Sequence, residues 1–265
     1  MQKRSFLLGF AATAFSLLFS GSALADGQVF RVGVTPGPHA QVMEKVQEVA
    51  AKEGLKIEIF EFNNYVVPNQ ALASKELDAN SFQHKPYLDN QVKTQNLDLV
   101  SVGETILLPM AVYSHKIKSM SELKDKAVVG IPNDPSNGGR ALLVLQDMGL
   151  IKLDPNAGLL VTPTDIIENP KKLEIFELEA AQLPHALGEF DIAVVNTNYA
   201  VAVGLNPKKQ ALFVEGVDSP YMNIVAVRSE DKDSEKVKAF LRAYHSDEVK
   251  AFIEETFDGA ILASW

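Results

Sequence analysis

The sequence of 265 residues contains no cysteine, which excludes a disulfide framework and a cysteine nucleophile. The same absence leaves no cysteine to carry a lipid, so we expect a protein without a lipid anchor. No cluster of lysine and arginine interrupts a chain whose net charge is -9, which makes nucleic acid a poor candidate partner. Beyond residue 25, no apolar run is long enough to cross a bilayer.

The motifs of several large enzyme classes are also missing. The chain has no G-x-S-x-G elbow, no H-E-x-x-H zinc motif, no P-loop and no G-x-G-x-x-G fingerprint. Its five histidines are scattered, and no two have metal-ligand spacing on one helix face. We therefore expect a protein that is not an enzyme and that holds no metal or cofactor.

The first 25 residues have the pattern of a secretory signal peptide. Lys3 and Arg4 form a basic start, an apolar stretch of mainly small and aliphatic residues follows, and Ala23 and Ala25 form a small-x-small cleavage site before Asp26. The alternative is an uncleaved membrane anchor, because the run is close to the minimum length for a span. The small residues at its end favour cleavage, so we expect a free protein in the periplasm.

Strand-like and helix-like patterns alternate along the rest of the chain. Residues 28–35 and 55–62 predict strands, and the helix predicted between them carries its apolar residues on one face. This βαβ beginning implies a parallel sheet with helices packed on it. Two helices, the first capped by Asp233, are predicted to follow the last strand. Further predicted strands span 104–114, 127–132, 190–196 and 220–228.

The middle of the chain predicts a second lobe. The segment from about 127 to 195 begins and ends with its own strands, as a second α/β unit inserted into the first would. We expect an α/β fold with two mixed or parallel sheets flanked by helices and joined by two linking strands. The predicted lobes are residues 26–112 with 225–265, and residues 113–224. Ligands of such proteins bind in the cleft between lobes.

Arg140 is the residue whose position most needs an explanation. It follows "SNGG" in the predicted first turn of a helix, where the macrodipole disfavours a cation. A guanidinium there can bind a carboxylate together with the free N–H groups of the helix start. Gly138 and Gly139 would let a ligand approach the backbone. The alternative is an ion pair with Asp134 or another surface acid.

Other polar and aromatic residues gather where predicted strands end, which is where open α/β sheets bind ligands. Each has a structural alternative. Phe82 and Tyr87 could belong to the core, and His84 could cap the helix that follows it. Asn196 and Asn198 could simply end one strand and begin the next helix.

Asn223 is harder to explain by structure alone. It lies inside an apolar predicted strand, on the same face as Tyr221, and a buried amide needs hydrogen-bond partners. An amide such as Asn196 or Asn223 could accept from the ammonium group of a small ligand. The aromatic residues would then enclose an apolar side chain of that ligand.

Five stretches of the sequence resemble the NlpA-type family, the methionine-binding proteins of ABC importers. The resemblance covers nearly the whole chain after the signal peptide, from about residue 29 to Trp265. It implies a periplasmic binding protein of two lobes, type II-like, that closes on its ligand by a hinge motion. The stretches are "VGVTPGPHAQ" (32–41), "FNNYVVPNQAL" (62–72), "LDANSFQHKPYLD" (77–89), "IPNDPSNGGRAL" (131–142) and "SPYMNIV" (219–225).

The resemblance also implies a ligand, partners and residue roles. Arg140 would bind the ligand carboxylate, Asn196 and Asn223 would bind the ligand through their amides, and the aromatic residues would line a thioether pocket. The partners would be L-methionine, with D-methionine or derivatives as alternatives, and an ABC permease with its ATPase; we expect a monomer. The predicted ligand-binding residues are Tyr65, Phe82, His84, Tyr87, Asn137, Arg140, Asn196 and Asn223.

One departure from the family and two rival functions stay open. Many members carry a cysteine at the cleavage site for lipid attachment, whereas this chain has "ALADGQ" there, which implies a freely diffusing protein. A binding protein for another small amino acid or peptide would have the same fold. A surface, adhesin-like interaction protein is the rival from another functional class.

Overall fold

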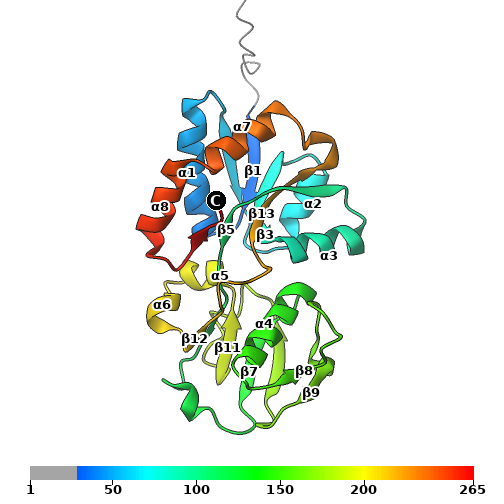
Figure 1. Ribbon diagram of the computed structural model, residues 1–265, viewed down its shortest axis with the longest axis vertical. Helices are drawn as coiled ribbons and strands as arrows, with labels where there is room; N and C mark the ends of the chain where they lie inside the picture. Colours follow the sequence, from blue (N-terminus) through cyan, green and yellow to red (C-terminus); the bar gives the residue numbers. More distant parts are fainter. Residues whose placement is uncertain (1–28) are drawn as a thin grey trace, which may run out of the picture.

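The computed structural model describes residues 29–265, which form two α/β lobes that lie one above the other in Figure 1. The predicted signal peptide, residues 1–25, lies outside the described residues. Each lobe is built on a five-stranded sheet. We call the lobe that contains β1 the first lobe and the lobe that contains β7 the second. Among the described helices, none combines the length and apolarity that crossing a membrane requires.

The sheet of the first lobe is mixed. Strand β1 runs parallel to both of its neighbours, whereas β13, which comes from much later in the chain, runs antiparallel to both of its own. The strands, in spatial order, are β2 (Ile57–Glu61), β1 (Phe30–Val34), β3 (Ala79–His84), β13 (Asn223–Arg228) and β4 (Leu99–Glu104).

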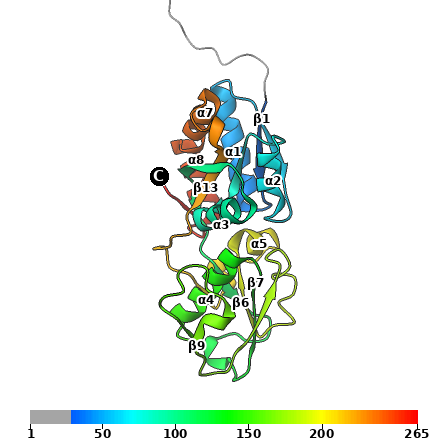
Figure 2. The same ribbon diagram turned by 90° about the vertical axis from the view of Figure 1, so that its right-hand side faces the viewer.

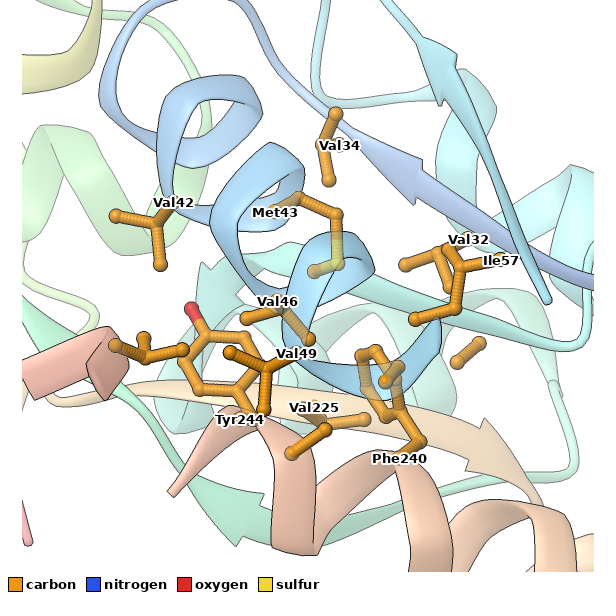
Figure 3. Close-up of a cluster of buried hydrophobic side chains, with 14 of the residues drawn as sticks. Val32, Val34, Val42, Met43, Val46, Val49, Ile57, Val225, Phe240 and Tyr244 are labelled. Carbon is orange, nitrogen blue, oxygen red and sulfur yellow. The ribbon is translucent and has the colours of Figure 1, made fainter. Parts of the chain in front are cut away.

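Helices cover both faces of this sheet. Helices α1 (Pro38–Lys52), α7 (Glu235–Tyr244) and α8 (Asp247–Phe257) pack on one face, and α2 (Val67–Ala73) and α3 (Lys85–Gln95) pack on the other. The apolar residues of α1 recur every three or four positions, so they form a single buried stripe. Figure 3 shows part of this stripe, Met43, Val46 and Val49, between the sheet and Phe240 and Tyr244 of α7.

The second lobe repeats this architecture. Strand β7 runs parallel to its two neighbours, and β6 runs antiparallel to both of its own. Helix α4 packs on one face of the sheet, and α5 and residues 183–190 pack on the other. The strands, in spatial order, are β10 (Glu174–Leu178), β7 (Val128–Pro132), β11 (Ile192–Val195), β6 (Ala111–Tyr113) and β12 (Phe213–Val214). The helices are α4 (Pro135–Asp147), α5 (Thr197–Ala202) and α6 (Pro207–Gln210).

Short elements complete the chain. Two small antiparallel pairs, β5 with β14 and β8 with β9, lie beside the main sheets. Three 3₁₀ turns connect larger elements. These elements are β5 (Ile106–Leu107), β8 (Lys152–Leu153), β9 (Ile166–Glu168), β14 (Leu262–Ala263), η1 (Met120–Glu122), η2 (Pro163–Asp165) and η3 (Ser229–Asp231).

The chain passes between the lobes twice, after β5 and again after β12, both of which are labelled in Figure 1. Figure 2 shows the two lobes from the side. The first crossing contains Pro109, which has no N–H group to donate to a sheet. The apolar run predicted as one strand over 104–114 is therefore interrupted at Pro109, between β5 and β6, and it is also interrupted at Thr105, between β4 and β5. The exact residues at which the lobes begin and end remain a prediction.

Two local predictions differ from the structure. Ser234 rather than Asp233 caps α7, because its side chain accepts the hydrogen bond from the N–H of Val237. The stretch "SMSELKDK" (119–126) predicts a short capped helix, but it forms only one 3₁₀ turn, η1. In both cases the predicted start lies within one residue of the observed N-cap, which is Ser234 for α7 and Ser119 for η1.

The topology brings the ends of several strands together. In the first lobe, β1 and β3 end beside the point where β13 begins, because β13 runs in the opposite direction. In the second lobe, β7 and β11 end side by side. Residues that follow or end these strands, among them His84, Asn137 and Asn196, line a single pocket between the lobes.

Candidate functional site

The pocket between the lobes contains all eight residues that the sequence predicted to bind ligand. About 340 Å³ between the lining residues is not filled by atoms. This volume includes space that is open to solvent, so it does not measure an enclosed cavity. Five further residues line the pocket and were not predicted to bind ligand, namely His39, Gln83, Leu108, Thr197 and Asn198.

Three aromatic side chains of the first lobe form one wall of the pocket. The ring centroids of Tyr65, Phe82 and Tyr87 lie 5.8–6.0 Å apart. Burial raises the pKa of Tyr65 and of Tyr87, so both hydroxyl groups stay protonated and act as donors. Tyr65 donates to Oδ1 of Asn198 at 2.6 Å, and Tyr87 donates to the carbonyl oxygen of Tyr65 at 2.9 Å. The ring faces of this wall are therefore apolar, and both tyrosine hydroxyl groups already donate to acceptors of the protein.

His84 both caps a helix and lines the pocket. Its Nδ1 atom accepts from the N–H of Tyr87, which makes His84 the N-cap of α3, and its Nε2 atom lies 3.1 Å from Oδ1 of Asn137. Burial, with a further contribution from Arg140, lowers the pKa of His84 to about 3. The ring is therefore neutral at pH 7. Because Nδ1 accepts, the proton sits on Nε2 and is donated to Asn137.

Asn137 holds Asn196 in one orientation. Its Nδ2 donates to Asp134, and its Oδ1 accepts from both His84 and Nδ2 of Asn196, the latter at 2.8 Å. Since the amide nitrogen of Asn196 is used in this way, Oδ1 of Asn196 is left buried without a hydrogen-bond partner among the described residues. A buried acceptor without a donor is costly unless a ligand supplies one.

The first lobe provides a second amide acceptor, the side chain of Asn223. Nδ2 of Asn223 lies 2.9 Å from Nε2 of His39, which is buried at the start of α1. Within residues 29–265, Oδ1 of Asn223 has no hydrogen-bond partner. The pocket therefore contains two amide oxygens, from opposite lobes, that can each accept from a ligand.

Arg140 is nearly fully buried and forms an ion pair with Glu215, not with Asp134. The two side chains are 4% and 9% exposed, and Nη2 of Arg140 lies 2.5 Å from Oε2 of Glu215. Nε donates to both oxygens of Glu215 at 3.0–3.1 Å, and Nη2 also donates to the carbonyl oxygen of Leu108 at 2.9 Å. The guanidinium lies over the ring of Tyr221, 4.6 Å from its centroid.

This ion pair changes what Arg140 can offer a ligand. Its Nε and Nη2 atoms are occupied, so the side-on bidentate fork is already used by Glu215. Nη1 has no hydrogen-bond partner in the described part of the chain. One edge of the cation therefore remains for an anionic group, while Glu215, Leu108 and Tyr221 hold the other side in place.

The start of α4 differs from the prediction in two respects. The helix begins at Pro135 with Asp134 as its N-cap, so Arg140 lies in the second turn, away from the free N–H groups of the first. The two glycines accommodate neighbouring backbone carbonyl groups of the protein and not a ligand. A Cβ atom on Gly138 would lie 2.8 Å from the carbonyl oxygen of Pro132, and one on Gly139 would clash with the carbonyl oxygen of Leu159.

Gly139→Ala is expected to lower the free energy of unfolding by about 1–3 kcal/mol, as overpacking does in other protein interiors. The contact is with a backbone carbonyl, which cannot move aside as a flexible side chain would. Urea denaturation followed by circular dichroism measures the change. Gly149→Ala is not a matched control, because Gly149 has a positive φ; Gly188→Ala is, since nothing lies within 4 Å of its added methyl group. Equal stability of the Gly139 and Gly188 variants would contradict this prediction.

Hydrogen bonds across the cleft hold the two lobes together. Tyr65 of the first lobe bonds Asn198 of the second, and His84 bonds Asn137. The rings of Tyr65 and Tyr199 lie 4.9 Å apart across the same boundary. The structure is therefore a closed arrangement, in which these contacts enclose the pocket.

The chemistry of the pocket matches a small zwitterion with an apolar side chain. One edge of Arg140 can bind a negative group, the oxygens of Asn196 and Asn223 can accept from a positive one, and the aromatic wall can pack an apolar group. Within residues 29–265, no three His, Cys, Asp or Glu side chains gather closely enough to hold a metal ion.

Two of the pocket residues that the sequence analysis did not predict also lie near strand ends, as the predicted residues do. His39 follows the end of β1, and Asn198 follows the end of β11, so both lie at the strand ends where ligands bind. The sequence places Asn198 at the end of a predicted strand, but the predicted site does not include it. Glu215 could not be identified, because it lies in a loop 75 residues from Arg140.

Comparisons with known proteins agree on one family. The sequence profile of the family described as NlpA lipoprotein matches residues 30–265. The D-methionine-binding lipoprotein MetQ of Salmonella typhimurium is 50% identical over 255 residues, which are 95% of this chain and 94% of that protein.

Two solved structures have the same fold. A nutrient-binding protein from Burkholderia cenocepacia bound to methionine is 52% identical with a TM-score of 0.87, over 89% of this chain and all (100%) of that one. An ABC transporter periplasmic substrate-binding protein from Coxiella burnetii is 44% identical with a TM-score of 0.86, again over 89% of this chain and 100% of that one. These likenesses confirm the predicted two-lobed α/β fold.

The expected location of the protein is wrong. A free periplasmic protein without a lipid anchor was expected, whereas the matching family and the Salmonella relative are named lipoproteins, which lipids hold at a membrane. The expectation rested on the absence of cysteine from this chain. That absence alone does not establish a freely diffusing protein.

Proposed function

The chain belongs to the NlpA lipoprotein family, as its sequence motifs predicted, and from this premise we propose that it is the methionine-binding protein of an ABC importer. The lobes close on methionine, and the loaded protein delivers it to a permease that is driven by an ATPase. Relatives named as methionine-binding proteins, and one named as the substrate-binding protein of an ABC transporter, support this function.

The buried, unpartnered oxygen of Asn196 is the observation that carries the proposal. Asn137 holds the nitrogen of Asn196 at 2.8 Å, so the oxygen cannot turn away from the pocket without breaking that bond. A primary ammonium group supplies the missing donor, and the oxygen of Asn223 supplies a second acceptor for it. Free amino acids carry such a group, whereas N-blocked peptides do not.

The remaining contacts select the rest of the ligand. The free edge of Arg140 binds the carboxylate, and the pair with Glu215 fixes the direction of that edge. The wall of Tyr65, Phe82 and Tyr87 packs the thioether side chain. Sulfur–aromatic contacts contribute modestly, roughly 0.3–1.5 kcal/mol each, so shape and burial carry most of this preference.

Binding without chemistry is part of the proposal. The relatives are named as binding proteins. The polar groups of the pocket are neutral imidazoles, amides, phenols, one paired arginine and the hydroxyl of Thr197, which donates to the carbonyl oxygen of Pro109. None of these arrangements pairs a nucleophile with a base of suitable pKa. The protein therefore holds its ligand unchanged.

Mass spectrometry of ligand released from denatured protein, followed by a thermal-shift screen of the unloaded protein, tests this function. We expect released methionine and a rise in melting temperature with methionine that exceeds the rise with other amino acids. A larger shift with another amino acid would retain the fold and the Arg140 contact but contradict the thioether pocket. No released ligand and no shift with any amino acid would overturn the proposed function.

A further inference from the structure

His39 occupies a position between the two lobes that the proposed function does not explain. The ring is 3% exposed and lies at the second residue of α1. Its two nitrogens have different partners. Nε2 lies 2.9 Å from Nδ2 of Asn223, and Nδ1 lies 2.8 Å from the hydroxyl oxygen of Thr35.

The hydrogen bonds determine which nitrogen carries the proton. Burial lowers the pKa of His39 to about 3, so the ring is neutral and has one N–H group. The amide nitrogen of Asn223 can only donate, and therefore Nε2 of His39 accepts. The proton is then on Nδ1 and is donated to Thr35.

Thr35 extends this arrangement to the second lobe. Its hydroxyl oxygen also accepts from Nδ2 of Asn198, at 3.3 Å. Oδ1 of Asn198 in turn accepts from Tyr65. A continuous set of hydrogen bonds therefore runs from the amide of Asn223 through His39 and Thr35 to the contact that closes the lobes.

We propose that His39 is a positioning residue that holds the nitrogen of Asn223 away from the pocket, so that its oxygen faces the ammonium group of the ligand. Without His39, the amide of Asn223 could turn over and present an NH₂ group to the ammonium, which is repulsive. His39 does not touch the ligand in this role. The inference rests on the proposed function, because it requires a ligand with an ammonium group.

Two substitutions distinguish the contributions of the two ring nitrogens of His39. His39→Gln places an amide near the position of Nε2 and can still accept from Asn223, whereas His39→Asn reaches only the position of Nδ1 and keeps the partner Thr35. We expect His39→Asn to weaken methionine binding at least about tenfold and His39→Gln to stay within about threefold of the wild type. Isothermal titration calorimetry measures the affinities, and thermal unfolding without ligand confirms that each variant folds.

A double-mutant cycle with Asn223→Ala distinguishes positioning from a general structural role. If His39 acts through Asn223, then His39→Asn in the Asn223→Ala background causes no further loss of affinity. Additive losses, or equal affinities of the Asn and Gln variants, would overturn the inference while leaving the proposed function intact. Absence of methionine binding by the wild type would overturn the proposed function and this inference together.

Discussion

Arg140→Ala is expected to weaken methionine binding by at least about 2 kcal/mol and to lower the free energy of unfolding without ligand by about 3–5 kcal/mol. The first effect arises because the ligand carboxylate loses its only cationic partner among the described residues of the pocket. Calorimetry measures the affinity, and urea denaturation measures the stability. Wild-type affinity in this variant would contradict the carboxylate assignment.

The second effect arises from Glu215. Its carboxylate is 9% exposed and keeps only neutral donors, the N–H of Met110 and the hydroxyl of Ser219, once Arg140 is gone. An uncompensated buried charge is far more costly than the net worth of the ion pair. A loss of this size is a large part of the total stability of a typical domain, roughly 5–15 kcal/mol.

A double substitution separates the two effects. Arg140→Met with Glu215→Leu removes both charges and keeps similar volumes, so we expect it to recover much of the lost stability. Methionine binding should not recover, since no cation is restored to the pocket. Recovery of affinity in the double variant would show that Arg140 acts on the fold and not on the ligand.

The local order of the fold followed from patterns within short stretches of sequence. The stripe of Val42, Met43, Val46 and Val49 predicted α1, and all four side chains are buried. Alternating or continuous apolar runs predicted β1, β2, β7 and β11 to within about two residues, and β13 with a start three residues too early. The sequence analysis did not predict β3, β10 and β12 or most of β4. The lobes were predictable because the middle segment begins and ends with strands of its own. Pro109 indicated an edge or a crossover within the run 104–114, but the further break at Thr105, between β4 and β5, was not predicted.

The residues of the candidate site were predictable where a polar or aromatic residue stands at the end of a predicted strand. His84 illustrates the limit, because the sequence presents helix capping and pocket lining as alternatives, whereas the ring does both through its two nitrogens. What could not be predicted depends on residues far apart in sequence. Glu215 meets Arg140, and Leu159 meets Gly139, only because the second lobe folds them together.

Acid is expected to destabilise the closed protein through its two buried histidines. Lowering the pH from 8 to 5 should reduce the free energy of unfolding by about 2 kcal/mol for each of His39 and His84, about 4 kcal/mol together. Both have a pKa lowered to about 3 in the folded state, chiefly by burial. Urea denaturation at a fixed, saturating methionine concentration measures the change while the lobes stay closed.

The direction of this change in the free energy of unfolding follows from the pH range in which each state binds protons. Between the ordinary histidine pKa, about 6.5, and about 3, the unfolded chain takes up protons that the folded protein excludes, so stability is complete above this window and falls through it. Asp134 acts in the opposite direction, because burial raises the pKa of its carboxyl group and protonation there favours the fold. Asp134 therefore offsets part of the loss that the two histidines cause.

A variant that cannot titrate at these positions provides the control. His39→Gln with His84→Gln removes both imidazoles, so its stability should change much less between pH 8 and pH 5 than that of the wild type. The comparison is between slopes, so the stability lost through the missing cap of α3 does not affect it. If the free energy of unfolding changes equally with pH in the two proteins, the imidazoles are not held neutral in the folded state. Water would then reach them in the closed pocket.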